Sequence, residues 1–375
     1  MANERAYWLA WAALSGVGPV LIKRIYEQFG SLAIAWDADL PALVAVDGIG
    51  GKLAETIIAH RPHLSPTDLL EQQLKTSPNF WTPADAAYPR LLFEITDPPP
   101  VLYYRGNAAP ELGQGSLPIV GVVGTRSPSN YGKRWTKNLT AALTRHGFTI
   151  VSGLADGIDA VAHQACLEHQ GYTVAVLGTG VDVVYPRHHQ RLYDAVVEKG
   201  LVLSEYANGT APDRSHFPRR NRIIAGLSRA VLVTEAPQRS GALITARLAN
   251  DYGRDVYALP SSLDNGRGRG CLELINQGGH IILGEKELLE ALGSLPYLAE
   301  AAAADEAKLL PQPELSNELN QVYAQVSADP ISLDSIVLSV EMNTGSVLSA
   351  LLQLEVMGLV ACLPGMQYQR TPPAA

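Results

Sequence analysis

Short apolar runs and amphipathic segments alternate along the chain between Ile119 and about Leu292. The runs are rich in β-branched residues, while the segments between them have helical patterns. We therefore expect strands at Ile119–Val123, Thr149–Val151, Thr173–Leu177, Leu201–Leu203, Ala230–Thr234, Asp255–Leu259 and His280–Leu283. This βαβ order predicts the α/β class, with a Rossmann-like domain whose mostly parallel sheet has helices on both faces. Ligands of such folds bind at the carboxyl ends of the strands, near the point where the strand order reverses.

The segment before this region contains a weak internal repeat. Leu14–Pro19 and Val46–Gly51 are glycine-containing turns, and a helical pattern follows each of them. The repeat predicts a small all-α helix-hairpin-helix/SAM-like domain at residues 1–75. Amides at the start of the second helix of each unit could receive a phosphate without reading base sequence. Alternatively, the glycines only allow the helical hairpins to pack against each other.

The chain after the sheet region predicts a linker and a third domain. Residues 298–315 are rich in Ala, Pro and acidic residues, which is typical of a linker. Three helices and a hairpin follow, a winged-helix-like pattern, at Ser316–Ala328, Ser332–Ser339, Thr344–Gly358, Leu359–Leu363 and Gln367–Arg370. The third helix contains Glu355 and no Lys or Arg, so we expect this domain to bind protein or to be structural. The expected boundaries are 1–75, 80–295 and 316–375, with the linker at 296–315.

The composition is that of a globular protein, since 47% of the 375 residues are hydrophobic and 18% are charged. No apolar run approaches the roughly 20 residues that a membrane span needs, and Met1–Arg5 lacks the features of a signal peptide. We therefore expect a cytoplasmic protein without membrane contact. Cys166, Cys271 and Cys362 form no C-x-x-C pair, so neither a disulfide framework nor a zinc site is expected.

The distribution of charge favours a polyanionic partner in spite of the net charge of −8. Phosphate binding depends on cationic side chains, and the planar guanidinium group can contact a phosphate through two donors. Residues 210–254 contain three acidic residues, no lysine and eight arginines, which are Arg214, Arg219, Arg220, Arg222, Arg229, Arg239, Arg247 and Arg254. This region predicts a basic patch inside an acidic protein.

The turn after the first expected strand contains Gly124, Thr125 and Arg126. The glycine lets the backbone come close to a ligand, Thr125 offers a hydroxyl group, and Arg126 supplies a guanidinium group at the expected crevice. The alternative for Arg126 is a surface ion pair. Its place at the carboxyl end of a strand favours phosphate binding.

The turn after the second expected strand begins with Ser152 and Gly153, two further candidate contacts. Asp159 and His163 are four residues apart on one helical face, which is compatible with acid/base or metal chemistry. A simpler interpretation is that the turn needs its glycines for backbone freedom and Asp159 for capping. The pair His188-His189 has no nearby Cys or second His pair, so a metal site there is the less favoured interpretation.

The segment Phe217–Gly226 combines an aromatic ring, three arginines and an amide group before an apolar helical run. Single-strand-binding proteins use such parts: Arg219, Arg220 and Arg222 could track phosphates, Phe217 could stack on a base, and Asn221 could bond a base edge or a phosphate. The alternative is a capped helix whose arginines pair with Asp213, Glu205 or Glu235.

A third turn, with Ser240, Gly241 and Thr245, follows the strand Ala230–Thr234. Ser240 is expected to cap a helix whose amino-terminal end points at the same crevice, where the helix dipole and free amides favour an anion. Three turns and an arginine-rich loop at one edge of the sheet predict an extended phosphate-binding groove.

Six motifs, taken in order, resemble those of the DprA/Smf family of DNA-processing proteins: Gly124-Thr125-Arg126, Ser152–Asp159, Val174–Gly180, Tyr185-Pro186, Phe217–Ile224 and Ser240–Ala246. The resemblance covers about Ala87 to Leu283. It implies a homodimer that protects incoming single-stranded DNA and loads the RecA recombinase onto it during natural transformation. It also implies that DNA contacts Arg126 and a binding loop with Phe217, Arg219, Arg220 and Asn221.

Two departures from the family pattern affect one loop. Pro260-Ser261 stands where Pro-Gly is usual, and Gly270-Cys271-Leu272 stands where Gly-x-Asn is usual. The loop from Ser261 to Leu272 is therefore not carried over as a DNA contact, although Arg267 and Arg269 could reach a phosphate.

Two enzymatic alternatives remain. The fold also resembles nucleotide-hydrolysing phosphoribohydrolases of the lysine decarboxylase-like type, but no Glu follows Ser240–Thr245 where their motif has one. A dehydrogenase would need a dinucleotide fingerprint, which the sequence lacks. We therefore expect a binding protein with no catalytic residue, no metal and no cofactor.

Overall fold

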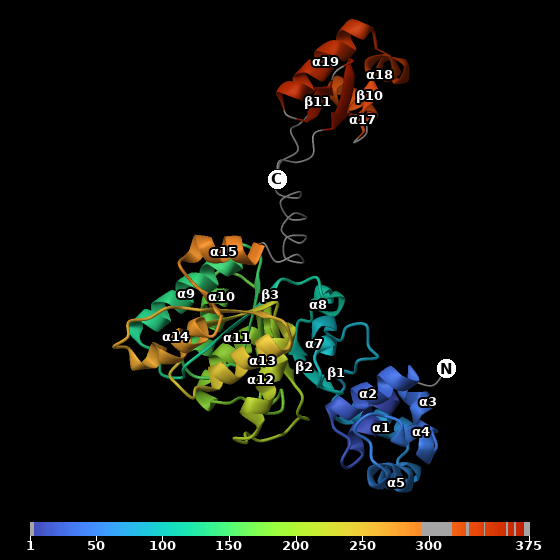
Figure 1. Ribbon diagram of the computed structural model, residues 1–375, viewed down its shortest axis with the longest axis vertical. Coiled ribbons are helices and arrows are strands. Elements are labelled where there is room, and N and C mark those ends of the chain that lie inside the picture. Colours follow the sequence, from blue (N-terminus) through green and yellow to red (C-terminus); the bar gives the residue numbers. More distant parts are fainter. Residues whose placement is uncertain are drawn as a thin grey trace. The chain divides into compact units, whose positions relative to one another are not determined.

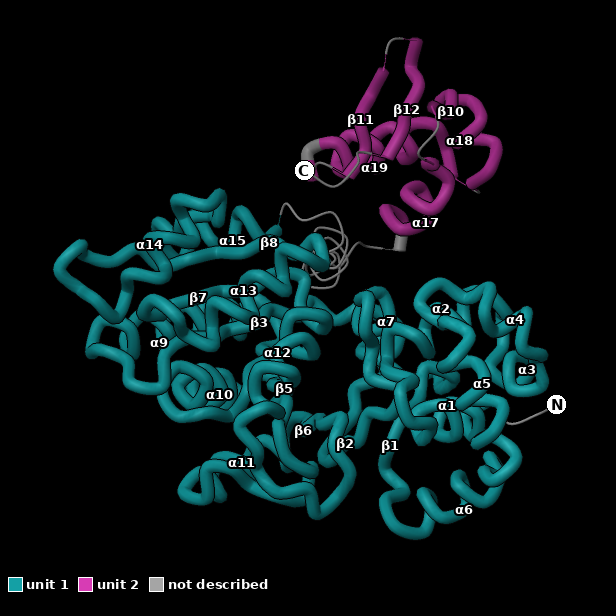
Figure 2. Tube along the Cα trace, turned by 60° about the horizontal axis from the view of Figure 1, so that its bottom comes forward, with its two compact units in different colours: residues 1–303 teal, residues 304–375 magenta. Residues whose placement is uncertain are grey.

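The computed structural model describes residues 4–293, 317–327, 330–340, 342–357, 359–363 and 365–370. The chain forms two compact units, Met1–Ala303 and Ala304–Ala375 (Figures 1 and 2). The expected linker at 296–315 lies outside the described residues, and the other expected domain boundaries stay predictions.

Helices form the first part of unit 1: α1 (Glu4–Ala13), α2 (Pro19–Phe29), α3 (Leu32–Trp36), α4 (Leu40–Val44), α5 (Gly51–His60), η1 (Arg61–His63) and α6 (Pro66–Thr76). The two glycine turns of the repeat have matching roles. Gly16 and Gly48 have φ angles of 82° and 89°, and Gly18 and Gly50 are the N-caps of α2 and α5. Left-handed backbone favours glycine, so the repeat in the sequence reflects two equivalent helix-hairpin-helix turns.

The helix-hairpin-helix segment packs directly on the residues that follow it. The ring centroids of Trp8 and Phe93 are 6.3 Å apart, and Lys23 Nζ donates a hydrogen bond of 2.8 Å to the carbonyl oxygen of Ile95. Arg5 Nε lies 3.0 Å from a carboxylate oxygen of Asp85. These contacts join the helices to the sheet region within one compact unit.

A nine-stranded sheet forms the centre of unit 1, in the order β1-β2-β6-β5-β4-β3-β7-β8-β9. The strands are β1 (Phe80–Trp81), β2 (Leu102–Gly106), β3 (Ile119–Gly124), β4 (Thr149–Ser152), β5 (Thr173–Val176), β6 (Leu201–Ser204), β7 (Ala230–Glu235), β8 (Asp255–Ala258) and β9 (His280–Ile281). All neighbours from β6 to β9 in this order pair in parallel, which confirms the expected Rossmann-like sheet. Strands β1 and β2 were not predicted from the sequence, and they extend the β6 edge of the sheet with antiparallel pairing.

Helices cover both faces of the sheet (Figure 1). They are α7 (Arg90–Glu94), α8 (Pro110–Gln114), α9 (Asn130–Arg145), α10 (Ile158–Glu168), η2 (Arg187–His189), α11 (Gln190–Lys199), α12 (His216–Leu227), α13 (Gly241–Asp251), η3 (Gly266–Gly268), α14 (Arg269–Asn276) and α15 (Glu285–Gly293). Val120 and Val122 of β3 pack in one buried cluster with α9, α10 and α15, whereas Ile119 and Val123 pack in another with α12, α13 and α14. This alternation follows from the two-residue period of a strand buried on both faces.

Unit 2 contains α17 (Asn317–Gln325), β10 (Ile331–Ser332), α18 (Leu333–Ser339), α19 (Thr344–Val356), β11 (Val360–Leu363) and β12 (Gln367–Arg370). Its three helices and hairpin confirm the winged-helix-like pattern, and the short β10 completes a three-stranded sheet. Within the described ranges, no single helix has both the length and the apolar composition of a membrane span. Only the bent pair of helices α18 and α19, taken together, has that length and composition. That this unit binds protein or is structural, rather than reading DNA, stays a prediction.

Candidate nucleic-acid interface

A cleft of about 600 Å³ opens at the carboxyl ends of the parallel strands. The strand order reverses at β3, because β4 lies on one side of it and β7 on the other. Residues after β3, β4, β5, β6 and β7 line the cleft, and they are Gly124, Thr125, Arg126, Ala155, Asp159, Tyr185, Arg214, Phe217, Pro218, Arg220, Asn221, Ile224, Ser240, Gly241, Ala242 and Thr245, together with Val123. The expected convergence of separate turns at the reversal point is therefore present.

The β3–α9 turn brings the backbone close to its neighbours. A Cβ atom on Gly124 would lie 2.4 Å from Ile158 Cγ1 and 2.8 Å from the carbonyl oxygen of Glu235, so only glycine fits. The amide of Thr125 donates to that same carbonyl oxygen over 2.7 Å. This packing fixes the turn and leaves the side chain of Arg126 exposed at the cleft.

Arg126 and two aromatic rings form one side of the cleft. The guanidinium carbon of Arg126 lies 5.5 Å from the ring centroid of Phe217, within the range of a cation–π contact. The rings of Phe217 and Tyr185 are 5.5 Å apart with an interplanar angle of 30°. A Cβ atom on Gly178 would lie 2.9 Å from Phe217 Cδ1, so this glycine leaves the space that the ring needs. The side chains together offer flat apolar surface beside a positive charge.

Arg220 lies below this surface and is only 4% exposed. Its Nη1 donates to the carbonyl oxygens of Gly153, over 2.8 Å, and of Val176. Burial lowers the pKa of Arg220 to about 10, against the attraction of Asp159, so the group stays charged at neutral pH. A Cβ atom on Gly153 would lie 2.4 Å from Arg220 Nη2, which explains why glycine stands there. Arg220 is therefore a fixed cation in the floor of the cleft.

The opposite side of the cleft is the start of α13. The Ser240 hydroxyl accepts a hydrogen bond of 3.3 Å from the Ala242 amide, which confirms Ser240 as the helix cap. Asn221 Nδ2 donates to the Gly241 carbonyl oxygen over 3.2 Å and joins α12 to this end of α13. Thr245, one turn further along, is buried at the cleft wall. A helix start of this kind carries partial positive charge and free amides, which suit an anion.

Four of the predicted contact residues do not line this cleft. Ser152 is buried, and its hydroxyl donates to the Val122 carbonyl oxygen over 2.6 Å. Gly153 lines a smaller neighbouring pocket. The side chain of Arg219 is 57% exposed, with its Nε 3.8 Å from Glu205, whereas that of Arg222 is 4% exposed. Whether any of them touches DNA stays a prediction.

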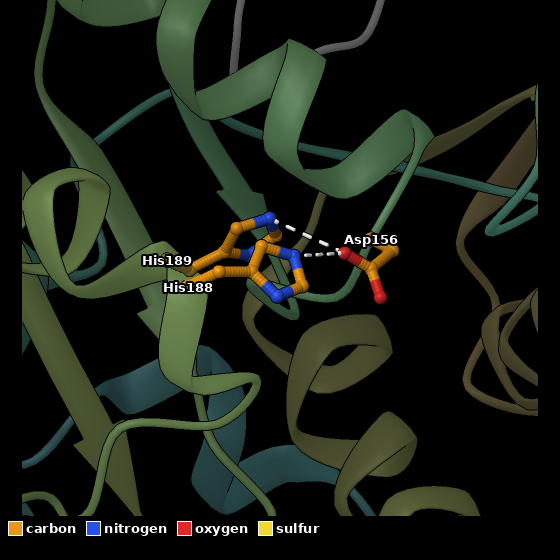
Figure 3. A group of neighbouring side chains, drawn as sticks. All are labelled: Asp156, His188 and His189. Atoms are coloured by element: carbon orange, nitrogen blue, oxygen red, sulfur yellow. Dashed lines mark hydrogen bonds and ion pairs between the residues drawn. The ribbon is translucent and has the colours of Figure 1, made fainter.

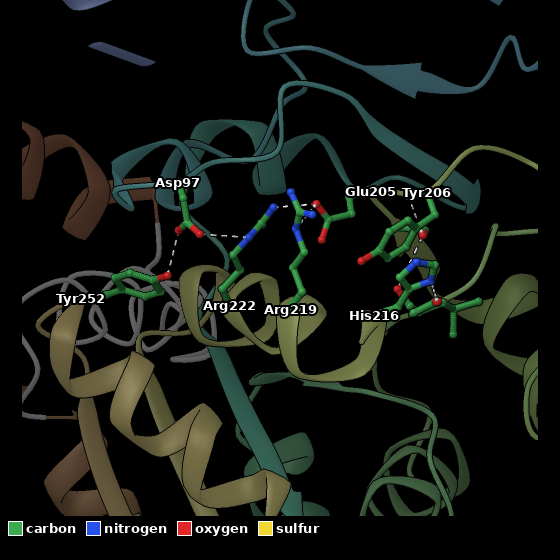
Figure 4. A network of polar contacts seen from close by, with 10 residues as sticks. Asp97, Glu205, Tyr206, His216, Arg219, Arg222 and Tyr252 are labelled. Atoms are coloured by element: carbon green, nitrogen blue, oxygen red, sulfur yellow. Dashed lines mark hydrogen bonds and ion pairs between the residues drawn. The ribbon is translucent and has the colours of Figure 1, made fainter. Parts of the chain in front are cut away.

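Arg222 is the centre of a buried polar network (Figure 4). Its Nη2 lies 2.6 Å from a carboxylate oxygen of Glu205, and its Nε lies 3.1 Å from one of Asp97. The Tyr252 hydroxyl donates to the other carboxylate oxygen of Asp97 over 3.0 Å. The network ties α12, which carries Phe217, to the segment around Asp97. For Arg219 and Arg222, the alternative of ion pairs with Glu205 is therefore observed.

The loop that departs from the family pattern, Ser261 to Leu272, contacts a buried carboxylate that also binds the N-cap residue of α9. Asn265 Nδ2 donates to the buried carboxylate of Glu235 over 3.1 Å, and that carboxylate also accepts hydrogen bonds from the amide and hydroxyl of Ser129. Arg267 and Arg269 are exposed and are not among the cleft-lining residues. The loop therefore supports the start of α9.

Asp159 and His163 each have partners of their own. A carboxylate oxygen of Asp159 accepts hydrogen bonds from the amides of Gly153, over 3.1 Å, and Ala155, over 3.4 Å. His163 Nδ1 lies 2.8 Å from Thr173 Oγ1, which itself donates to the Ile150 carbonyl oxygen, so Nδ1 is the donor to Thr173. Burial raises the pKa of Asp159 against the opposing effect of Arg220. The arrangement matches the interpretation in which this turn is structural.

His163 gives the fold a specific sensitivity to acid. Burial, assisted by Arg220, lowers the pKa of His163 to about 3 from 6.5. Protons therefore bind the unfolded chain more readily between these two values, and stability is lost as pH falls below 6.5. His163→Asn keeps a hydrogen-bond donor near the position of Nδ1 but has no group that titrates. We therefore expect the variant to lose less stability than wild type as pH falls, by up to about 1.4 kcal/mol per pH unit.

Urea unfolding of both forms at pH 7 and pH 5 measures the effect of His163. His146→Asn, at an exposed histidine, is the matched control. Equal losses of stability in wild type and His163→Asn would contradict a neutral buried imidazole.

Of the cleft-lining residues that were not predicted contacts, Tyr185 and Arg214 bring an aromatic ring and a cation. Tyr185 appeared in the sequence only within the Tyr185-Pro186 motif, and Arg214 appeared only in the count of arginines. Both stand in irregular segments, where no periodicity indicates which way a side chain points.

The comparison with known proteins matches this geometry to one family. A family model described as DNA recombination-mediator protein A covers residues 79–293, more than half of the chain. The chain belongs to the DprA/Smf family. Further models match residues 303–366 as a DprA winged helix domain and residues 12–60 as a SAM-like helix-hairpin-helix tandem. The expected family and fold class are both confirmed.

Relatives within the DprA/Smf family match different shares of the chain, from 57% to 99% in the examples that follow. Protein Smf of Synechocystis sp. is 48% identical over 99% of this chain and 100% of its own length. The X-ray structure of DNA processing protein A from Streptococcus pneumoniae has a TM-score of 0.65 at 36% identity, covering 77% of this chain and 98% of that one. A DNA processing protein A structure from Helicobacter pylori, described for its single-stranded DNA binding mode, has a TM-score of 0.51 at 30% identity, covering 57% and 95%.

Proposed function

We propose that this DprA/Smf chain binds single-stranded DNA in the cleft at the strand ends, protects incoming DNA, and loads RecA onto it during natural transformation. We further propose that it acts in the cytoplasm as a homodimer and catalyses no reaction. The guanidinium group of Arg126 over the ring of Phe217, which itself packs against Tyr185, carries the proposal, since a cation next to flat rings suits a strand with accessible bases. The name of the Helicobacter pylori structure gives independent support.

The proposed contacts divide by their placement. The residues that we propose touch DNA are those at the cleft, which are Gly124, Thr125, Arg126, Arg214, Phe217, Asn221, Ser240, Gly241 and Thr245. Arg219 is exposed on the adjoining part of α12 and is proposed as an outer phosphate contact. Arg220 would act mainly through its charge. Ser152, Gly153 and Arg222 are proposed as residues that position the others.

The salt dependence of binding to a fluorescent oligo-dT strand tests the electrostatic part of the proposal. Three to five phosphate contacts give a log–log salt slope of roughly −2 to −3.5 for a single strand. We expect Arg126→Ala to make this slope shallower by about 0.7, because one contact is lost. Arg145→Ala, an equal charge change at the exposed carboxyl end of α9, should leave it unchanged.

A duplex of the same length and an incubation with AMP complete this test. Equal affinity for duplex and single strand, or equal slopes for Arg126→Ala and Arg145→Ala, would count against the cleft as the DNA site. Release of free base from AMP would favour the phosphoribohydrolase alternative. Asp159, the acidic residue of the cleft lining, accepts hydrogen bonds from two backbone amides, so its carboxylate is already engaged in holding the turn.

The proposed partners have separate tests. Light scattering of the full chain at micromolar concentration should give the mass of a dimer, and a monomer mass would contradict the homodimer. On single-stranded DNA covered by a single-strand-binding protein, the chain should shorten the lag before RecA hydrolyses ATP. An unchanged lag would contradict RecA loading without affecting the DNA-binding proposal.

A further inference from the structure

Three side chains with metal-ligating atoms meet between the β4–α10 loop and η2 (Figure 3). Asp156 belongs to the loop between β4 and α10, and His188 and His189 belong to η2. His188 Nε2 lies 2.7 Å and His189 Nε2 lies 3.4 Å from the same carboxylate oxygen of Asp156. The three ligand atoms all lie within 4.8 Å of one another. Two imidazole nitrogens and one carboxylate oxygen therefore face a common point.

The orientation of His189 indicates which atom faces that point. Its Nδ1 lies 3.0 Å from the carbonyl oxygen of Leu154, which can only accept a hydrogen bond, so Nδ1 carries the proton. In the neutral ring, Nε2 then presents its lone pair toward the Asp156 carboxylate oxygen, 3.4 Å away. A metal ion can bind to both atoms in this arrangement. A backbone carbonyl that fixes the other ring nitrogen is also the usual support of a metal-bound histidine.

The exposure of the three side chains suits a site that exchanges its ion with solvent. His189 is 12% exposed and is held in place, whereas Asp156 is 45% and His188 is 67% exposed. Because His188 is open to water, its proton can move from Nε2 to Nδ1, which frees Nε2 as a ligand. Metal binding would then replace the hydrogen bond between His188 and Asp156 by three metal–ligand bonds, one to each of the three side chains.

We propose that Asp156, His188 and His189 bind a divalent transition-metal ion of the Zn²⁺ type. Tetrahedral metal–ligand bonds of about 2.0–2.2 Å place ligand atoms about 3.3–3.6 Å apart. The 3.4 Å between His189 Nε2 and the Asp156 oxygen already fits this spacing, whereas the exposed His188 must move by less than about 1 Å from its hydrogen bond of 2.7 Å. The two imidazoles select such ions over Mg²⁺ and Ca²⁺, which prefer oxygen ligands. Three protein ligands leave a fourth position open. From the sequence, a metal was the less favoured interpretation because the His188-His189 pair has no nearby Cys or second His pair. Asp156, 32 positions before His188, comes close only in the fold.

The open position would face the DNA site. Asp156 lines a small pocket together with Arg126, Tyr185 and Phe217. A bound ion adds positive charge there, and its open position can accept a phosphate oxygen. This consequence rests on the proposed function, whereas the metal site itself does not.

Equilibrium dialysis of the tag-free full chain against Zn²⁺ tests the site. We expect one ion per chain and a loss of affinity of about tenfold or more in His188→Ala and in Asp156→Asn. Co²⁺ should give a visible absorption band in wild type that both variants lose. His63→Ala, at an exposed histidine of η1, is the matched control and should bind as wild type does. His188 is exposed, so its variant should fold. No bound Zn²⁺ in wild type, or equal affinity in the variants, would overturn the proposal.

Oligo-dT binding with and without Zn²⁺ distinguishes the metal site itself from its proposed role in binding a DNA phosphate. We expect Zn²⁺ to strengthen binding by wild type and His63→Ala but not by His188→Ala. A metal bound without this effect would refute only the bridging role. Failure of every form to bind oligo-dT would contradict the proposed function and leave the dialysis result valid.

Discussion

Arg222→Met is expected to lower the free energy of unfolding of the chain by about 3–5 kcal/mol. The change leaves the carboxylates of Glu205 and Asp97 without their cation, and the side chain of Glu205 is only 8% exposed. A buried charge without a partner is costly because the protein interior solvates it poorly. Urea unfolding followed by circular dichroism measures the loss.

Arg219→Met is the matched control for this network. The side chain is mostly exposed, and its distance of 3.8 Å to Glu205 marks a weak pair, so we expect a loss below about 1 kcal/mol. Adding Glu205→Gln and Asp97→Asn to Arg222→Met should recover part of the stability, since the uncompensated charges are then gone. Equal losses for the two arginine variants would mean that the buried network does not stabilise the fold.

Phe217→Ala should weaken binding of oligo-dT by about 1–3 kcal/mol, which is roughly 5- to 150-fold in affinity. The ring is the flat surface that lies between Arg126 and Tyr185, and bases stack on such rings whatever their identity. Phe217→Tyr keeps the ring and should bind within about twofold of wild type. Fluorescence anisotropy at one fixed salt concentration measures all forms.

Phe217→Leu distinguishes stacking from burial of apolar area. Leucine keeps most of the apolar volume but has no aromatic face, so we expect an affinity near that of Phe217→Ala. Wild-type affinity in Phe217→Leu would indicate that apolar contact alone is sufficient. Wild-type affinity in Phe217→Ala, in a variant whose unfolding is unchanged, would refute the stacking role.

The parallel sheet and the place of the cleft could be predicted because both follow from local patterns. Strands buried on both faces leave continuous apolar runs, and a turn after each run places Gly124 and Ser240 at the same edge. The strands β1 and β2 were not predicted, because Phe80–Trp81 is too short to show a period and Leu102–Gly106 lies among Pro- and Gly-rich residues.

The orientations of the arginines could not be predicted. Four consecutive positions of α12 contain Arg219, Arg220 and Arg222. The helical period points their side chains in different directions, but it does not show which of these directions is buried. The answer depends on carboxylates far along the chain, such as Asp97, whose position only the fold determines. For the same reason, the contact between Asp156 and His188 could not be predicted from the sequence.

The loops that line the cleft follow five adjacent strands, β6, β5, β4, β3 and β7. Neighbouring strands are about 4.8 Å apart, so the row of loops is only about 19 Å long. An extended DNA strand laid along this row of loops would pass beyond the protein after a few nucleotides. The length of DNA covered would then grow with the number of protein chains assembled on it. The share of a long DNA strand that stays accessible to nucleases would depend on the spacing between neighbouring protein copies more than on the affinity of each site.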